Sequence, residues 1–115
     1  MPTIENENSK EIDYHAKHDM GKPKISLVPP QILIDIAEVR EFGNNKYGDS
    51  ESWKKVEMQR YVDALLRHLI AFVRDPNAVD DESGIKAYKH AACNMAFICE
   101  MMREKDISIK NTPDI

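Results

Sequence analysis

The feature that most constrains how this chain can fold is the helical periodicity of its apolar residues. The period is clearest in residues 56–74, where apolar side chains occupy one half of the helix circumference. That half, which we expect to be core, consists of Tyr61, Val62, Leu65, Leu66, Leu69, Ile70, Phe72 and Val73. Residues 30–47 and 84–105 are periodic too, and no useful length of chain alternates as a half-buried strand does. The sequence therefore predicts an all-α fold with three main helices, at about 30–47, 56–74 and 84–105, in a small bundle.

A chain of 115 residues has room for one domain, which we place at residues 21–105. Residues 1–20 are polar and lack apolar periodicity, so we expect a flexible N-terminal arm there. Residues 21–30 contain three prolines and are expected to be extended, and residues 106–115 to form a C-terminal tail. Trp53, in the loop after the first helix, is expected to act as a lid over the core.

Charge and composition exclude several classes of partner. The net charge of −4 removes the basic surface that nucleic-acid binding needs, so we expect no nucleic-acid partner. No run of apolar residues is long enough to span a membrane, and no secretory signal is recognisable, so we expect a cytoplasmic protein. Cys93 and Cys99 are then expected to be reduced core residues. Because so small a domain buries little surface, we also expect a homodimer or homotetramer.

Two polar residues lie where the third helix should be apolar. His90 and Asn94 are one helical turn apart, on a surface made otherwise of alanine, methionine, phenylalanine and isoleucine. Burying such groups costs a few kcal/mol unless they find partners. One interpretation is that they satisfy each other or a nearby carbonyl in the core. The other is that they face a ligand.

Charged residues elsewhere favour the ligand interpretation. Arg67 and His68 flank a strip of small residues on the second helix, and Asp80 and Glu82 directly precede the third helix. A guanidinium, imidazoles and carboxylates gathered in one place suit a metal, a phosphate or both. For Arg67 alone, an ion pair with Asp63 on a solvated face is an equal alternative.

The first helix carries a second candidate set of ligands. Glu38 and Glu41 are three residues apart, so that their carboxylates could share one Mg²⁺ ion. Most pairs with this spacing are simply solvated, so the spacing leaves both interpretations open.

Four segments together resemble a known family, the small phage-encoded dATP/dGTP diphosphohydrolases, which are similar to the MazG-like all-α NTP pyrophosphohydrolases. The segments are HDMGKPKISLVPP (18–30), FGNNKYG (42–48) followed by Trp53, RYVDALLRH (60–68) and DDESGIKAYKHAACNMAF (80–97). The resemblance covers most of the chain, and the ordered set is more specific than any one segment.

The resemblance implies an enzyme that converts a purine dNTP (dATP or dGTP) to the dNMP and pyrophosphate, with Mg²⁺ or Mn²⁺ as cofactor. For a phage enzyme, the cytoplasm would be that of the host cell. The roles that it implies fall into three groups. The catalytic residues would be Asp80, Glu82 and His90. The substrate-binding residues would be Lys22, Lys46, Arg67, His68 and Asn94. The metal ligands would be Glu38, Glu41, Asp80 and Glu82.

The chain departs from the MazG-like pattern in its third helix. Such enzymes carry an ExxE motif and a later ExxD motif, whereas this helix has no ExxD and presents His90 and Asn94 instead. Either Asp80 and Glu82 supply the missing oxygens, or the site is built differently. Two alternatives to an enzyme therefore stay open: a protein that binds or sequesters a nucleotide without chemistry, and a structural helical adaptor.

Overall fold

The computed structural model describes residues 20–110, and of residues 107–110 the backbone alone. In this part of the chain there are three α-helices and no strand. The elements are η2 (Ile25–Leu27), α2 (Gln31–Tyr47), η3 (Ser52–Lys55), α3 (Met58–Arg74) and α4 (Ala87–Lys110), where η marks a 3-10 helix. The all-α prediction is confirmed. Of the predicted N-terminal arm only residue 20 lies within the described residues, and residues 111–115 of the predicted tail lie outside them.

The first two helices follow the predicted boundaries closely. α2 ends at Gly48, which has a φ of +72° and donates its N–H to the carbonyl of Asn44 at 2.8 Å. α3 begins two residues later than predicted, because η3 extends to Lys55 and the N–H of Val56 closes it on the carbonyl of Trp53.

The third helix is shifted along the sequence at both ends. It begins at Ala87 rather than residue 84, since Gly84 turns the chain with a φ of +72° and the backbone then pairs with the preceding loop. The N–H of Asp80 donates to Ile85 at 2.8 Å, and the N–H of Ala87 to Ala78 at 2.9 Å. α4 runs to Lys110, past the predicted end at residue 105, because the sequence between Lys105 and Pro113 contains neither glycine nor proline to end the helix.

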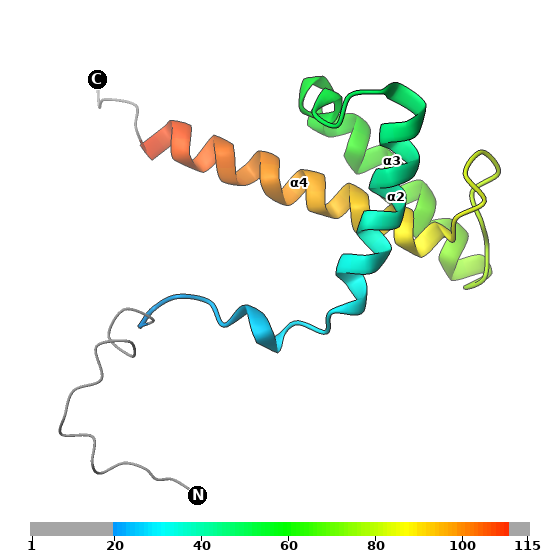
Figure 1. Ribbon diagram of the computed structural model, residues 1–115, viewed down its shortest axis with the longest axis horizontal. Coiled ribbons are helices and arrows are strands. Elements are labelled where there is room, and N and C mark those ends of the chain that lie inside the picture. Colours follow the sequence, from blue (N-terminus) through cyan, green and yellow to red (C-terminus); the bar gives the residue numbers. More distant parts are fainter. Residues whose placement is uncertain (1–19, 111–115) are drawn as a thin grey trace, which may run out of the picture.

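α4 is the central helix, and α2 and α3 both pack on its N-terminal half (Figure 1). Trp53 closes one side of this packing, with its ring centroid 4.7 Å from that of Phe97. The apolar side chains that are buried are few and mostly small. Among the described residues they are Ile85, Ala87, Ala91, Cys93 and Ile98.

The prediction that the whole apolar half of α3 is core is wrong for the single chain, since part of that half is exposed. Four residues of the apolar half of α3 are 42–78% exposed, and we call them the α3 stripe: Leu66, Leu69, Ile70 and Val73. Helical periodicity identifies an apolar face, but it does not say whether the same chain covers that face.

The two cysteines differ in burial. Cys93 is buried, which raises the pKa of its thiol to about 11, whereas Cys99 is exposed. The prediction that both lie in the core is therefore wrong for Cys99. Six residues of helix turn the two side chains to different sides of α4. Within the described residues, no helix combines the length and the apolar character needed to cross a bilayer.

Candidate functional site

A cavity of about 620 Å³ opens between the C-terminal end of α2, the η3 loop, α3 and the start of α4. Its volume falls within the roughly 300–1,000 Å³ that small-molecule sites occupy. One end of its wall is polar, and it carries seven of the residues that the sequence indicates as site residues. These are Lys46, Arg67, His68, Asp80, Glu82, His90 and Asn94. Four parts of the chain supply them, namely α2, α3, the loop before α4 and α4 itself, so the fold brings them together.

Two imidazoles lie face to face in the polar end. The ring centroids of His68 and His90 are 4.9 Å apart, with the planes 19° from parallel. Burial lowers the pKa of both histidines, and the nearby carboxylate of Asp80 opposes this only in part. Both rings are therefore predominantly uncharged at neutral pH, as a proton acceptor must be.

Ser83, which sequence reasoning missed, holds His90 in place. Its hydroxyl oxygen lies 2.7 Å from Nε2 of His90 and also accepts the N–H of Ile85 at 3.1 Å. The serine sits between Glu82 and Gly84 in a loop that gave no periodic signal. Its nearness to His90 depends on the Gly84 turn, which brings the loop back to the start of α4.

The loop is ordered by Asp80, whose carboxylate accepts the N–H groups of Glu82 at 3.1 Å and Ser83 at 3.0 Å. Burial tends to raise the pKa of Asp80, but the hydrogen bond from Ser83 and the charge that His90 can carry outweigh it, and the pKa is lowered overall. Asp80 therefore stays ionised at the polar end of the cavity.

Lys46 connects the end of α2 to this loop. Its Nζ forms an ion pair and hydrogen bond with Oε2 of Glu82, which raises the pKa of Lys46. Both side chains are more than a third exposed, so the pair is accessible to solvent and to a ligand. Such an exposed pair contributes little to stability and can exchange partners.

Asn94 carries the one unpaired acceptor among the buried side chains of the described residues. Its Oδ1 is inaccessible to solvent and has no hydrogen-bond partner, while the residue lines the cavity. An unmet buried acceptor costs about 1–3 kcal/mol. Asn94 and His90 therefore do not satisfy each other, contrary to one of the two interpretations above.

The part of the cavity wall around Phe97 is aromatic, and we call it the aromatic end; nothing in the sequence pattern marked it as part of a site. Phe97 contacts the rings of both Trp53 and Tyr61, at centroid distances of 4.7 and 4.9 Å. The guanidinium of Arg40 lies 5.3 Å from the Phe97 ring, and the hydroxyl of Tyr61 donates to the carbonyl of Trp53 at 2.7 Å. At helical spacing an aromatic residue looks like core, so nothing in the pattern separated these residues from ordinary packing.

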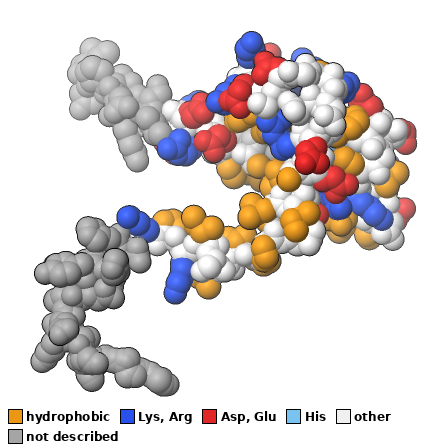
Figure 2. Space-filling model, viewed as in Figure 1, with side chains coloured by type: hydrophobic (Ala, Val, Ile, Leu, Met, Phe, Trp, Pro, Cys, Tyr) orange, Lys and Arg blue, Asp and Glu red, His pale blue; other side chains and the backbone are white. Residues whose placement is uncertain are grey.

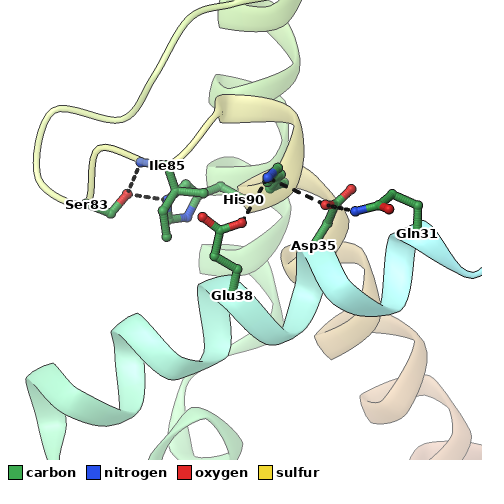
Figure 3. A network of polar contacts seen from close by, with 7 residues as sticks. Gln31, Asp35, Glu38, Ser83, Ile85 and His90 are labelled. Carbon is green, nitrogen blue, oxygen red and sulfur yellow. Dashed lines mark hydrogen bonds and ion pairs between the residues drawn. The ribbon is translucent and has the colours of Figure 1, made fainter.

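Glu38 and Glu41 do not line the cavity. Glu38 accepts a hydrogen bond from Nζ of Lys89 at 2.9 Å, and the same ammonium lies 3.6 Å from buried Asp35, which Gln31 also contacts at 3.1 Å. We call these residues the lysine cluster: Gln31, Asp35, Glu38 and Lys89. We call the set His68, Ser83, His90 and Asn94 the histidine cluster. Figure 3 shows members of both, with Ser83, Ile85 and His90 at the loop and Gln31, Asp35 and Glu38 along α2.

The remaining predicted residues lie apart. Glu41 is exposed on α2, and Lys22 is exposed in the segment before η2 and does not line the cavity. Between residues 20 and 110, no three histidine, cysteine, aspartate or glutamate side chains gather closely enough to hold a metal by themselves. Of the four predicted metal ligands, the structure brings Asp80 and Glu82 into the cavity wall and leaves Glu38 and Glu41 outside it.

Comparison with known proteins identifies the family of this chain. Residues 13–110 match the family described as dATP/dGTP diphosphohydrolase, N-terminal. A relative from Salmonella phage PMBT28, named dATP/dGTP diphosphohydrolase, is 33% identical over 92 residues, which are 80% of this chain and 31% of the relative. The chain thus spans about a third of that relative's length. None of the solved structures matches it. Because the family match covers most of its residues, the chain belongs to the dATP/dGTP diphosphohydrolase family, in the region described as N-terminal.

Proposed function

We propose that this chain hydrolyses a purine deoxynucleoside triphosphate, dATP or dGTP, to the monophosphate and pyrophosphate, with Mg²⁺ or Mn²⁺. The observation that carries the proposal is one cavity with a polar end and an aromatic end, large enough for a nucleotide. The family membership and the name of the phage relative support the same substrate class.

The polar end suits a triphosphate. Lys46 and Arg67 supply the positive charge, and both line the cavity on exposed side chains. A guanidinium can contact phosphate oxygens through two N–H groups at once. Lys46 leaves Glu82 for the phosphates when the nucleotide binds. These two residues then stabilise the charge on the departing pyrophosphate.

The carboxylates of this end suit a divalent cation. Mg²⁺ often uses only one or two protein carboxylates and takes its other ligands from water and substrate phosphates. Asp80 and Glu82 meet that requirement, so a site without a third carboxylate still fits the ion. When bound there, the metal supplies electrostatic stabilisation of the charge on the phosphate oxygens.

His90 is the proposed general base. Its imidazole is uncharged at neutral pH and is oriented by Ser83, so it can accept a proton from the attacking water. The water oxygen bonds to the α-phosphorus, and the bond from that phosphorus to the bridging oxygen of pyrophosphate breaks. His68, stacked on His90, fixes the plane of the ring and contacts the substrate.

The aromatic end suits the base. Purines present flat π-surfaces that stack on aromatic side chains, and here such side chains line the cavity from four elements. Asn94 turns its orphan Oδ1 toward the cavity when the nucleotide binds and accepts an N–H or O–H from it, which removes the desolvation cost of that oxygen.

The enzyme acts as a homodimer or homotetramer in this proposal. The few buried apolar side chains and the exposed α3 stripe support it, since a single chain leaves much of its apolar surface in water.

One observation favours a second candidate, a protein that binds the nucleotide without hydrolysing it. No group of three potential metal ligands gathers in residues 20–110, and a weakly bound metal would limit catalysis. Phosphorus NMR of dATP or dGTP incubated with the protein and Mg²⁺ separates the two. We expect pyrophosphate and the monophosphate in equal amounts. Nucleotide binding with no product would favour the second candidate.

The matched variants for this experiment are Glu82→Gln and Glu100→Gln. Glu82 lies in the polar end, whereas Glu100 is exposed on α4, away from that cavity. We expect the first variant to lose most of its turnover and the second to keep it. Equal turnover in both would remove Glu82 from the mechanism.

A further inference from the structure

Residues 20–110 carry two apolar surfaces that no other described residue covers. One is the α3 stripe, whose members are spaced i, i+3, i+4 and i+7 and so lie on one helix face. The other is the segment of residues 20–34, which we call the entry segment. Its large apolar side chains are 43–78% exposed: Met20, Ile25, Leu27, Val28, Ile32, Leu33 and Ile34.

Residues 20–30 of the entry segment stand apart from the helices, and residues 31–34 form the first turn of α2. Figure 1 shows residues 20–30 leaving the start of α2 on a separate path, and Figure 2 shows apolar side chains along their length. η2 closes with a hydrogen bond from the N–H of Val28 to the carbonyl of Ile25 at 3.0 Å, so the segment has local order of its own. An ordered segment with this much exposed apolar surface needs a covering partner.

The exposed apolar area of the two surfaces together is as large as one side of a stable protein interface. The eleven large apolar side chains of the two surfaces leave on the order of 1,000 Å² in water, compared with the roughly 800 Å² that each partner contributes to a standard interface. If two copies paired only through their α3 stripes, most of the entry segment would stay in water. A contact that buries the α3 stripe against the entry segment therefore fits better, because it covers both surfaces at once.

The charges beside the two surfaces are complementary. Lys22 and Lys24 are exposed at the start of the entry segment, and Asp75 and Asp81 are exposed in the loop that follows α3. Opposite charges at the rim of an apolar contact fix its orientation and favour its encounter.

The first turn of α2, with the entry-segment residues Ile32, Leu33 and Ile34, has a fixed place in its own chain. The ion pairs of Lys89 with Asp35 and Glu38 hold α2 on α4. A second copy offers its α3 stripe to these side chains from outside, and reciprocal exchange closes the contact with two-fold symmetry.

We propose that two copies of this chain exchange entry segments, so that residues 20–34 of each cover the α3 stripe of the other. The contact lies outside the cavity lining, and it specifies the surface by which the oligomer forms.

Cysteine cross-linking tests the contact directly. In a Cys99→Ser background, one chain carries Leu27→Cys and another carries Ile70→Cys, and the two are mixed under mild oxidation. We expect a disulfide-linked pair from this mixture. A mixture of Leu27→Cys with Tyr47→Cys, an accessible position at the far end of α2, should give none. Cross-linking of both mixtures alike, or of neither, would overturn the exchange.

Sedimentation equilibrium gives an independent result. At micromolar concentration we expect wild-type chains of at least twice the monomer mass. Leu27→Lys, and separately Ile70→Lys with Val73→Lys, should each shift the mass to that of one chain. Since these side chains are exposed within the chain, circular dichroism should show unchanged helix content.

Three outcomes would contradict the proposal. A monomeric wild type would mean that no second copy covers the stripe, and would leave residues 1–19 or a different protein as its partner. Loss of mass in the α3 variant alone would indicate packing of α3 on α3. Loss of mass in the entry-segment variant alone would place its partner surface elsewhere than the α3 stripe.

Discussion

The lysine cluster and the histidine cluster meet at the start of α4, but they differ in how far their polar groups are paired. The groups of the lysine cluster pair with one another, whereas the histidine cluster keeps an unpaired acceptor. Lys89 and His90 are neighbours at the start of α4. Lys89 contacts two carboxylates and Gln31 donates to one of them, so each charged group there has a partner. Around His90 the imidazoles are uncharged and Asn94 keeps an unmet acceptor. Groups that satisfy one another hold two helices together, whereas groups left unsatisfied beside a cavity are available to a ligand.

The largest contrast should appear between two neighbouring substitutions. His90→Gln removes the proposed base and should lower kcat roughly 10²–10⁴-fold, with little change in the free energy of unfolding. Lys89→Gln should lower the free energy of unfolding with little change in kcat, because it loosens α2 from α4 while leaving the cavity lining in place. Steady-state pyrophosphate release and urea unfolding of both variants measure this. Similar kinetic losses in the two would erase the distinction between the clusters.

Asn94→Leu should separate ligand binding from stability. It removes an unmet buried acceptor at similar volume, so the free energy of unfolding without ligand should rise by about 1 kcal/mol. Binding of the nucleotide should weaken roughly tenfold, because its donor loses a partner. Thermal unfolding and calorimetric titration give the two quantities. A less stable variant with unchanged affinity would make Asn94 a structural residue.

Asp35→Ala tests the lysine cluster from its buried side. The carboxylate is only 8% exposed and receives Gln31 and Lys89, so its loss should lower the free energy of unfolding by about 1–3 kcal/mol. The kcat should stay within a few-fold of wild type, since Asp35 does not line the cavity. Chemical denaturation together with the kinetic assay checks both halves. A collapse of kcat in a folded variant would mean that this cluster belongs to the site.

Acid should weaken the histidine cluster specifically. Burial lowers the pKa of His68 and His90 in the folded chain, so between those values and about 6.5 the unfolded chain binds more protons. The free energy of unfolding should therefore fall as the pH drops below about 6.5, with no contribution from these groups above it. The double variant His68→Gln, His90→Gln should show a smaller slope in that window. An unchanged slope would assign the acid sensitivity to other groups.

The smallest effect should come from the turn that brings Ser83 to His90. Gly84 has a φ of +72° with open space around its Cα, so Gly84→Ala should cost only about 1–2 kcal/mol of backbone strain. The accompanying loss of kcat should be a few-fold, because the displaced loop positions Ser83. Kinetics and unfolding of this variant check it, and full activity would show that the loop tolerates the change.

Most of the polar residues that the sequence singles out do line one cavity, and there is a physical reason why they stood out. His90 and Asn94 break an apolar pattern, and a polar group in a core position is informative because burying it is costly. Side-chain partners were harder to predict. Glu38 was expected at a metal, but its distance to Lys89 depends on how α2 crosses α4, which no spacing within one helix encodes.

Two further features lie beyond pattern reasoning. The contact of Ser83 with His90 depends on a single glycine turn in an irregular loop. The exposure of Ile70 and Val73 depends on what the chain associates with, whereas periodicity records only that the face is apolar.

The proposed nucleotide site is tested most directly by a crystal structure with a purine dNTP analogue whose α,β-bridge resists hydrolysis, together with Mn²⁺ located by its anomalous signal. We expect the triphosphate to contact Lys46 and Arg67 and the base to lie toward Phe97. We expect Mn²⁺ to bind Asp80 and Glu82. Mn²⁺ between Glu38 and Glu41, or a nucleotide outside the cavity, would contradict the proposal.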